Sequence, residues 1–306
     1  MATTPEELTR LDDIAERARA NGVGCEVIGP ERLRELEPHA AGLRALHVPE
    51  TGIVDYVAVC EALAGVLRAR GGEIATGTGV RRMESRGSEV VIETSRGEAV
   101  ARTAVNCAGL HSDRVLAATG QPRPARIVPF RGEYYELVPE ARGLVRNLIY
   151  PVPDPSFPFL GVHFTRSIHG GVECGPNAVL ALAREGYRWR DVNLRDLADT
   201  LGYPGFWRMA ARHWRMGSGE VWRSLSKNAF TRALQRLVPD IRANHLRHAE
   251  AGVRAQALSP DGALLDDFLI HTVGRVVHVL NAPSPAATSS LSIGRTVAEH
   301  TDVFLA

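Results

Sequence analysis

Residues 105–112 read Val105-Asn106-Cys107-Ala108-Gly109-Leu110-His111-Ser112, and they join a predicted strand to a predicted helix. The strand pattern ends at Asn106, and the helix pattern runs from Ser112 to Thr119. The small residues between them let a backbone approach a flat ligand closely, because Ala and Gly carry little or no side chain. An ordinary turn between strand and helix uses the same residues. The stretch indicates an α/β unit and leaves a ligand site at the turn open.

A second stretch of this kind is Asn281-Ala282-Pro283-Ser284-Pro285-Ala286-Ala287-Thr288. It follows a predicted strand over residues 276–280 and precedes a helix expected from about Pro285. The start of a helix offers unpaired N–H groups and a positive dipole end, which suit an anion or a heterocycle that becomes anionic on reduction. Ordinary capping needs fewer small residues, so this stretch favours a ligand site.

The other predicted elements alternate between helices and short strands. Thr4-Pro5-Glu6-Glu7 is a capping box that starts a helix, and Gly22 stops it. Further helices are expected over 30–37, 55–70, 112–119 and much of 190–237, and strands over 73–80, 89–94, 98–106, 133–137, 159–165, 263–270 and 276–280. The four tryptophans, Trp189, Trp207, Trp214 and Trp222, are interpreted as helix packing in the helical region over 190–237.

Composition excludes several classes of protein. The chain has 306 residues, with 36 Lys and Arg against 35 Asp and Glu, and a net charge of +1 argues against a nucleic-acid binder. Its four cysteines are far apart, so neither a disulfide framework nor a zinc site is indicated, and a reduced, cytoplasmic setting is expected. The sequence contains no apolar run long enough to span a bilayer.

Common catalytic and phosphate-binding motifs are missing from the sequence. It contains no His-Glu-x-x-His, no Gly-x-Ser-x-Gly and no complete Gly-x-Gly-x-x-Gly. No metal site is therefore expected, and the residues alone identify no pyrophosphate-binding loop.

Two arginines lie among apolar or small residues. Arg254 stands in Gly252-Val253-Arg254-Ala255, and Arg131 stands in Phe130-Arg131-Gly132-Glu133. Such an arginine needs an anionic partner, which is either an internal carboxylate such as Glu133 or Asp266, or a substrate carboxylate held by the guanidinium group. The sequence leaves both partners open. Tyr134 and Tyr135 are more typical of sheet packing than of a site.

Taken together, these segments resemble the FAD-dependent oxidoreductases of the D-amino-acid-oxidase/glycine-oxidase superfamily, and within it the L-2-hydroxyglutarate oxidase/dehydrogenase family. The resemblance covers essentially the whole chain. The matching stretches are VPETGIVDY (48–56), CAGLHSDR (107–114), RIVPFRGEYYEL (126–137), LIYPVPDPSFPFLGVHFTR (148–166), GPNAVLALAREGY (175–187), LGYPGFWR (201–208), AGVRAQALSPDGALLDDF (251–268) and NAPSPAATSSLSIG (281–294).

The resemblance implies an α/β (α+β) fold, in which an FAD/NAD(P)-binding-like domain lacks its first βα unit and a mixed-sheet substrate domain carries helices. It implies substrate-domain helices over 1–45, an FAD-binding part over 46–121, a substrate or cap domain over 122–250 and a final FAD-binding part over 251–306. Because the family's opening strand and Gly-x-Gly-x-x-Gly have no counterpart here, we expect an N-terminal truncation or a mis-assigned start, with weak or no FAD binding and low stability.

The resemblance also implies roles for particular residues. Val80 takes the position whose backbone meets the adenine of FAD, and Arg254 matches the arginine that holds the substrate α-carboxylate. Arg131, Tyr134 and His163 are placed in the substrate-domain sheet, and the catalytic base stays open. The residues expected to face FAD at the two turns are Cys107, Ala108, Gly109, Ser284, Pro285, Ala286, Ala287 and Thr288.

The implied reaction is oxidation of a 2-hydroxy dicarboxylate, L-2-hydroxyglutarate to 2-oxoglutarate, with hydride passing to the flavin. Two carboxylates call for two cationic anchors, Arg254 and a second such as Arg131 or Arg166. Oxygen or a quinone is the expected electron acceptor, and the resemblance allows attachment to the periphery of the inner membrane. The alternatives are a related amino-acid or 2-hydroxy-acid oxidase and a non-catalytic remnant without flavin.

Overall fold

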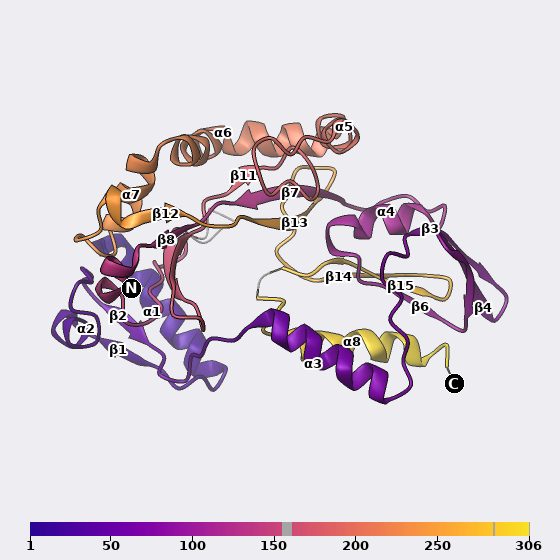
Figure 1. Cartoon of the computed structure of the whole chain (residues 1–306), viewed down its shortest axis with the longest axis horizontal. Coiled ribbons are helices and arrows are strands. Elements are labelled where there is room, and N and C mark those ends of the chain that lie inside the picture. Colours follow the sequence, from indigo (N-terminus) through magenta and orange to yellow (C-terminus); the bar gives the residue numbers. More distant parts are fainter. Residues whose placement is uncertain (155–160, 284, 306) are drawn as a thin grey trace. The chain divides into compact units, whose positions relative to one another are not determined.

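The computed structural model describes residues 1–154, 161–283 and 285–305, and the chain divides into two compact units. Unit 1 consists of Met1–Asp55, Arg131–Val179 and Trp214–Gly252. Unit 2 consists of Tyr56–Phe130, Leu180–His213 and Val253–Ala306. Each unit is therefore built from three separate stretches of sequence, which Figure 1 follows by colour. The mixed α/β class expected from the sequence is confirmed.

Unit 1 contains a four-stranded antiparallel sheet in the order β12-β8-β10-β9. Its strands are β8 (Tyr135–Leu137), β9 (His163–Arg166), β10 (Val172–Gly175) and β12 (Leu246–His248). Alternation along the strands turns one set of side chains to the same face, where they are buried with Phe230 and Leu234 of helix α7 (Lys227–Gln235). This set consists of Tyr135, Leu137, Phe164, Val172, Cys174 and Leu246.

The N-terminal part of unit 1 forms α1 (Pro5–Ala20), β1 (Glu26–Ile28), α2 (Pro30–Leu36) and β2 (Ala45–His47). The capping box at Thr4 and Glu7 is present, so the predicted first helix is confirmed. Leu11 of α1 packs with Ala2 and Val152 in a small core. Strands β1 and β2 form an antiparallel pair in which Ile28 lies opposite Ala45.

Unit 2 contains a three-stranded sheet in the order β14-β15-β6. Strand β15 (Val276–Asn281) is parallel to β6 (Ala104–Asn106) and antiparallel to β14 (Leu269–Val273). Val277 and Val279 pack with Val297 of α8 (Ser290–Asp302), whereas Val276 packs with Met83 and Val90. Both faces of β15 are thus covered, which explains why this strand is apolar along most of its length.

A meander of β3 (Val80–Arg86), β4 (Glu89–Thr94) and β5 (Gly97–Ala101) also belongs to unit 2. The turn predicted at residues 95–97 joins β4 to β5, with Thr94 opposite Gly97. The strand predicted over 73–80 is wrong, because the first strand of the meander, β3, begins at Val80. Gly77 interrupts the earlier stretch with a φ of +63°, a conformation outside the β region.

Two further predictions near the C-terminus differ from the structure. The strand expected over 263–270 lies at Leu269–Val273, because Leu264 instead makes an isolated bridge to Leu258. The last helix begins at Ser290 rather than near Pro285, since residues 285–289 form turns. The strand expected over 159–165 is found as β9 at His163–Arg166, and residues 159 and 160 lie outside the described residues.

The remaining elements complete the two units. A three-stranded sheet has the order β11-β7-β13. Helix α6 has non-helical dihedral angles at His213, where φ is −115°. The bounds of these elements are α3 (Tyr56–Ala69), η1 (Gly109–His111), α4 (Ser112–Ala117), β7 (Arg126–Gly132), η2 (Pro139–Leu144), β11 (Val179–Leu180), α5 (Leu194–Leu201), α6 (Pro204–Leu225), η3 (Ala243–His245) and β13 (Gly252–Leu258).

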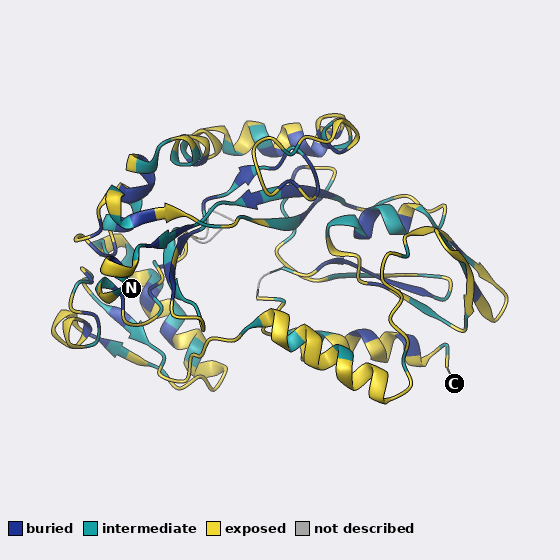
Figure 2. Cartoon of the chain, in the orientation of Figure 1, coloured by how far each residue is buried: buried dark blue, intermediate teal, exposed yellow. Residues whose placement is uncertain are grey.

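The tryptophans are exposed, and their interpretation as helix packing is wrong. Trp207, Trp214 and Trp222 on α6 expose 56%, 63% and 60% of their surface, and Trp189 exposes 42%. Figure 2 shows that exposed residues recur along α6. Helical periodicity places apolar residues on one side of a helix, but it does not say whether that side meets the core. Within the described ranges, no helix has the length and apolarity needed to cross a membrane.

Candidate functional site

The two turns predicted to face a cofactor lie at the same edge of one sheet. Strand β6 ends at Asn106 and leads into Cys107–Gly109, and β15 ends at Asn281 and leads into the second turn. Because β6 and β15 are parallel, their carboxyl ends lie together. In open α/β sheets, ligands bind outside this edge. The tertiary structure thus brings together two segments that are far apart in sequence.

The side chain of Asn106 fixes the first turn through two hydrogen bonds. Its side-chain Oδ1 accepts the Ala108 N–H at 3.1 Å, and its Nδ2 donates to the Ser112 carbonyl at 2.8 Å. The Ser112 hydroxyl reaches the Leu280 carbonyl at 3.4 Å. Gly109 has a φ of +53°, so any residue with a side chain would be strained here. The space where a Cβ would lie is open. This turn is therefore both fixed and accessible, since Cys107, Ala108 and Gly109 are all exposed.

Asn106 also contacts a buried histidine. Its Nδ2 lies 3.0 Å from Nδ1 of His278, which is completely buried in β15. Since the amide nitrogen is the donor, Nδ1 accepts and the imidazole proton lies on Nε2. Among the described residues, Nε2 has no hydrogen-bond partner. Burial lowers the pKa of His278 to about 4, with a smaller contribution from His271.

The second turn is anchored by Asn281. Its Nδ2 donates to the carbonyls of Leu265 and Asp267 at 3.1 and 2.8 Å, and its Oδ1 accepts the Ala257 N–H at 3.4 Å. Beyond it, Pro285, Ala287 and Thr288 are exposed, and Ala286 is half-buried. The Thr288 hydroxyl donates to the Pro285 carbonyl at 2.9 Å, which closes the turn. Ser284, the other residue predicted at this turn, lies outside the described residues.

Val80 is the remaining residue of unit 2 that was predicted to contact the cofactor. It is the first residue of β3 and exposes 43% of its surface. It lies opposite Thr94 in β4. Its exposure is compatible with the predicted contact to a ligand, which stays a prediction.

An ionic network that the sequence did not indicate supports the first turn. Asp113, the second residue of α4, accepts hydrogen bonds from Arg184, from Arg123 at 3.2 Å and from the Ile127 N–H at 3.2 Å. Asp199 of α5 accepts from Arg184 at 3.0 Å. Arg114 and Arg126 complete the network with Asp196 and Asp199. It ties α4, β7 and α5 to one another and so fixes the helix that follows Gly109.

The arginines of this network determine the ionisation of Asp199. Burial acts to raise its pKa, but the hydrogen bond and charge of Arg123 and the charges of Arg184 and Arg114 outweigh burial, so the pKa lies below its ordinary value. The carboxylate is therefore charged at neutral pH and pairs fully with the surrounding guanidinium groups.

Arg131 of unit 1 has an internal carboxylate partner. Its Nη2 lies 3.0 Å from Oε1 of Glu133, and only 1% of the Arg131 side chain is exposed. Glu133 also accepts a bond from Asn177 Nδ2 at 3.0 Å and another from the Ser224 hydroxyl. The sequence left open whether Arg131 pairs with an internal carboxylate or with a substrate carboxylate, and the structure contains the internal pair with Glu133. A further role of Arg131 in substrate binding stays a prediction.

The other substrate-site candidates are half-buried. In unit 1, His163 of β9 stacks on Tyr150, with ring centres 4.6 Å apart, and its Nδ1 lies 2.9 Å from the Gly161 carbonyl. The Tyr134 carbonyl accepts the Ala249 N–H at 3.0 Å, whereas Tyr135 packs on Phe230 in the core, as the sequence indicated. In unit 2, Arg254 lies on β13. Their roles toward substrate stay predictions.

The edge formed by the two turns fits the flat part of a flavin. It offers the exposed residues 107–109, an open space beside Gly109 and, on the neighbouring strand β15, the buried His278 Nε2, which has no hydrogen-bond partner among the described residues. No group of three His, Cys, Asp or Glu side chains suited to a metal ion occurs among the described residues.

Comparisons with known proteins agree with this fold. The family model described as FAD dependent oxidoreductase matches residues 1–300. The L-α-glycerophosphate oxidase of Mycoplasma pneumoniae, solved with FAD bound, superimposes with a TM-score of 0.74 at 17% identity over 98% of this chain and 71% of that one. Glycine oxidase from Geobacillus kaustophilus gives a TM-score of 0.67 at 20% identity over 99% and 69%. The chain belongs to the FAD-dependent oxidoreductase family.

Within that family, two similar curated proteins carry the same description. The L-2-hydroxyglutarate dehydrogenase of Indibacter alkaliphilus is 50% identical over 301 residues, which are 98% of this chain and 75% of the relative. The L-2-hydroxyglutarate dehydrogenase of Escherichia coli K12 is 45% identical over 307 residues, 100% of this chain and 73% of the relative. The resemblance stated from the sequence is thereby confirmed.

Proposed function

We propose that this chain oxidises L-2-hydroxyglutarate to 2-oxoglutarate in an FAD-dependent reaction. The observation that carries the proposal is the 45–50% identity to L-2-hydroxyglutarate dehydrogenases across nearly all of the chain. Bound FAD supplies the acceptor for the hydride from the hydroxyl-bearing carbon. This function is favoured over a flavin-free remnant, and over an oxidase for amino acids or monocarboxylic hydroxy acids.

The chain's own residues have proposed roles on both sides of this reaction. The Cys107–Gly109 and Ala286–Thr288 segments hold the cofactor through their backbone, since both lie at the carboxyl edge of the parallel pair β6 and β15. Arg254 binds the α-carboxylate of the substrate, because a guanidinium group matches a carboxylate with two parallel hydrogen bonds. Arg131 and Arg166 are the candidates for the second carboxylate, and His163 and Tyr134 line the substrate side.

Anaerobic reduction of the flavin tests the function directly. The chain is purified with added FAD, and the flavin absorbance is followed while L-2-hydroxyglutarate is added. We expect bleaching by L-2-hydroxyglutarate and much weaker bleaching by lactate, glycine or the D enantiomer. Bound flavin that L-2-hydroxyglutarate does not reduce would contradict the proposed substrate. A preparation that binds no FAD would instead favour the remnant.

We propose that a quinone, rather than oxygen, is the electron acceptor, because unit 1 has an exposed apolar surface suited to a membrane. One side of α6 carries four large apolar side chains at intervals of seven, one and three residues. They are Trp214, Val221, Trp222 and Leu225. We call these four residues the α6 apolar stripe. Their exposed fractions are 63%, 42%, 60% and 69%, so they place several large apolar side chains next to one another at the surface, as in interaction sites.

The charges around the α6 apolar stripe match an anionic lipid surface. Arg215 lies over the Trp214 ring, 5.3 Å from its centre. Glu220, the acid of this helix, is buried and accepts the Ala178 N–H at 3.1 Å. Tryptophan next to arginine is typical of helices that lie in the interface of a bilayer. Attachment there would give the enzyme access to a lipid-soluble quinone.

A further inference from the structure

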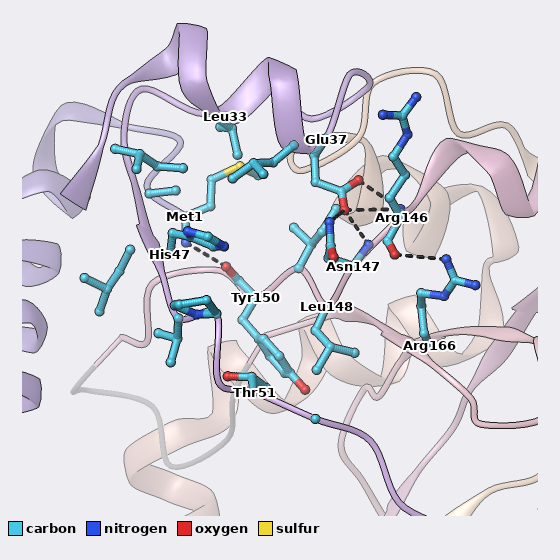
Figure 3. Close-up of a pocket in the computed structure, with 18 of the residues that line it drawn as sticks. Met1, Leu33, Glu37, His47, Thr51, Arg146, Asn147, Leu148, Tyr150 and Arg166 are labelled. Carbon is cyan, nitrogen blue, oxygen red and sulfur yellow. Dashed lines mark hydrogen bonds between the residues drawn. The ribbon is translucent and has the colours of Figure 1, made fainter. Parts of the chain in front are cut away.

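Arg254 lies in the same unit as the carboxyl edge of β6 and β15, where the cofactor is proposed to bind. The other two arginines proposed for the substrate belong to unit 1 and are bonded there. Arg131 pairs with Glu133 at 3.0 Å. Arg166 donates to the Arg146 carbonyl at 2.9 Å, beside a cavity of about 390 Å³ that Figure 3 shows. How Arg254 is held against the cofactor edge is therefore a question about unit 2 alone.

The strand of Arg254, β13, is an edge strand. It comes last in the sheet order β11-β7-β13, so only one of its sides pairs with β7. The backbone groups of Ala257 point to the other side, where its carbonyl accepts the Leu265 N–H at 3.0 Å. Ala257 follows Arg254 by three residues, which is about 10 Å along a strand. A partner for the Ala257 N–H therefore holds the strand close to the arginine.

Asn281, the last residue of β15, supplies this partner. Its Oδ1 accepts the Ala257 N–H at 3.4 Å, and its Nδ2 donates to the carbonyls of Leu265 and Asp267 at 3.1 and 2.8 Å. Asn281 is only 3% exposed. Since a carbonyl can only accept and an N–H can only donate, these three partners require both halves of an amide. Because β13 and β15 belong to different sheets, the Asn281 side chain is a bridge between two sheets of unit 2.

The pairing of β15 with β14 changes just before Asn281. Val279 lies opposite Ile270, whereas Asn281 lies opposite Leu269, so the register leaves Leu280 as an extra residue. An extra residue of this kind bends a strand and redirects a side chain, and such irregularities are common next to active sites. The Asn281 amide reaches β13 directly after this irregularity.

Apolar packing also joins these segments, but it has no direction. Ala257 is buried in a cluster with Ala125 and Ile127, and Leu110 and Leu265 pack against it. The hydrophobic effect depends on the area removed from water, so it holds segments together without fixing how far one slides along another. Hydrogen bonds have preferred distances and angles. The Asn281 amide is therefore the contact that sets the position of β13 at the end of β15.

We propose that Asn281 is a positioning residue that holds Arg254 at a fixed place relative to the cofactor edge of β6 and β15. This inference rests on the proposed function, which gives Arg254 a substrate carboxylate to bind. With the carboxylate held there, the hydroxyl-bearing carbon of the substrate is aligned with the hydride acceptor. A misplacement of about 1 Å can lower the rate of such a step roughly 100-fold, even when the change lies far from the reacting atoms.

Hydrogen exchange of the wild-type chain without FAD tests the bridge itself. If Asn281 holds the Ala257 N–H, this amide opens only when β13 separates from β15, so its exchange should lie within about tenfold of the amides at the end of β15. In Asn281→Leu the exchange of Ala257 should speed up by roughly fivefold or more. A wild-type Ala257 amide that exchanges like one on an open strand edge overturns the proposal, whatever the variants do.

Rapid-mixing reduction of the FAD-loaded chain by L-2-hydroxyglutarate tests the positioning. In Asn281→Leu and Asn281→Ala, the limiting rate of flavin reduction should fall about 10-fold to 100-fold, whereas the dissociation constant of the substrate should change less than about threefold. This split is the reverse of the one expected for Arg254→Ala, which removes the carboxylate contact itself. Gln235→Leu is the matched control and should keep the wild-type rate. The Gln235 amide also donates to a backbone carbonyl, that of Ile241 at 2.7 Å, but it lies on α7 of unit 1.

The outcomes separate positioning from a general structural role. Variants that are less stable but reach the wild-type limiting rate once loaded with FAD would make Asn281 structural only and overturn the proposal. A loss of rate in Asn281→Leu without one in Asn281→Ala would come from added bulk and overturn it as well. Wild-type bound flavin that L-2-hydroxyglutarate does not reduce contradicts the proposed function instead, and the exchange of the Ala257 amide then decides alone whether the bridge exists.

Discussion

Asp113 and Arg184 form an ion pair in the interior of unit 2, with side-chain exposures of 1% and 2%. The guanidinium group bonds both carboxylate oxygens, and Arg184 Nη2 lies 2.9 Å from Asp113 Oδ2. The two residues are 71 positions apart in the sequence. Because Asp113 belongs to the helix that follows Gly109, this pair connects the Cys107–Gly109 turn to the rest of unit 2.

Removing one charge of this pair should strongly destabilise the protein. Asp113→Asn leaves Arg184 buried without its full partner, and breaking a buried ion pair in this way costs about 3–5 kcal/mol. Chemical denaturation of the variant should show a loss of this size in the free energy of unfolding. The matched control is Asp240→Asn, whose carboxylate is 61% exposed beside His39 and should change stability by less than about 1 kcal/mol. Equal stabilities of the two variants would contradict the structural role of Asp113.

His278 should make stability depend on pH between about 4 and 6.5. Burial lowers its pKa from 6.5 to about 4, so in this range the unfolded chain binds a proton that the folded chain does not. The contribution to stability is therefore complete above pH 6.5 and is lost as the pH falls toward 4, by up to about 3 kcal/mol at 1.36 kcal/mol per pKa unit.

Denaturation curves at several pH values for wild type and His278→Leu measure this contribution. The difference in free energy of unfolding between the two proteins should change by up to about 3 kcal/mol between pH 6.5 and 4. His300→Gln, at an exposed position on α8, is the control and should follow the wild type. A difference between wild type and His278→Leu that stays constant over this range would refute the assignment.

Arg254 should be required for substrate affinity. Arg254→Ala removes charged hydrogen bonds worth about 1.5–3 kcal/mol, which corresponds to a loss of roughly 10-fold to 100-fold in kcat/KM, mostly through KM. Steady-state kinetics with L-2-hydroxyglutarate measure the loss, and Arg254→Lys should recover part of it because the charge remains. Arg86→Ala, in the exposed part of the meander, should leave the kinetics unchanged. A KM that Arg254→Ala does not alter would count against the carboxylate role.

The α6 apolar stripe should mediate binding to anionic membranes. The double variant Trp214→Ala and Trp222→Ala removes two large side chains, each worth about 1.5–3 kcal/mol when buried in an apolar environment, so vesicle binding should weaken by at least tenfold. Co-sedimentation with phosphatidylserine-containing vesicles measures this. Trp189→Ala removes an exposed tryptophan that is not part of α6 and should bind as wild type does. Equal binding by wild type, the double variant and Trp189→Ala would argue against a role of the α6 apolar stripe in membrane binding. So would the absence of binding by wild type.

Local elements of the fold were predictable because their signals are local. The capping box at Thr4 and Glu7 starts α1, and the turn at residues 95–97 joins two strands. Errors arose where the backbone departs from the propensity of its side chains, as at Gly77, where a positive φ precedes strand β3, which begins only at Val80. The family was also recognisable from ordered motifs along the chain, and the 45–50% identical relatives agree with it.

The sequence by itself determined the class of protein, the two small-residue turns and the candidate arginines. Only the tertiary structure decided that β6 and β15 pair in parallel and bring both turns to one edge, since that pairing joins Asn106 to His278 across 172 positions. It also decided that Asp113 pairs with Arg184, and that the tryptophans of α6 face outward. The physical reason is that burial and charge pairing depend on which segments pack together, whereas helix caps and turns depend on neighbours along the chain.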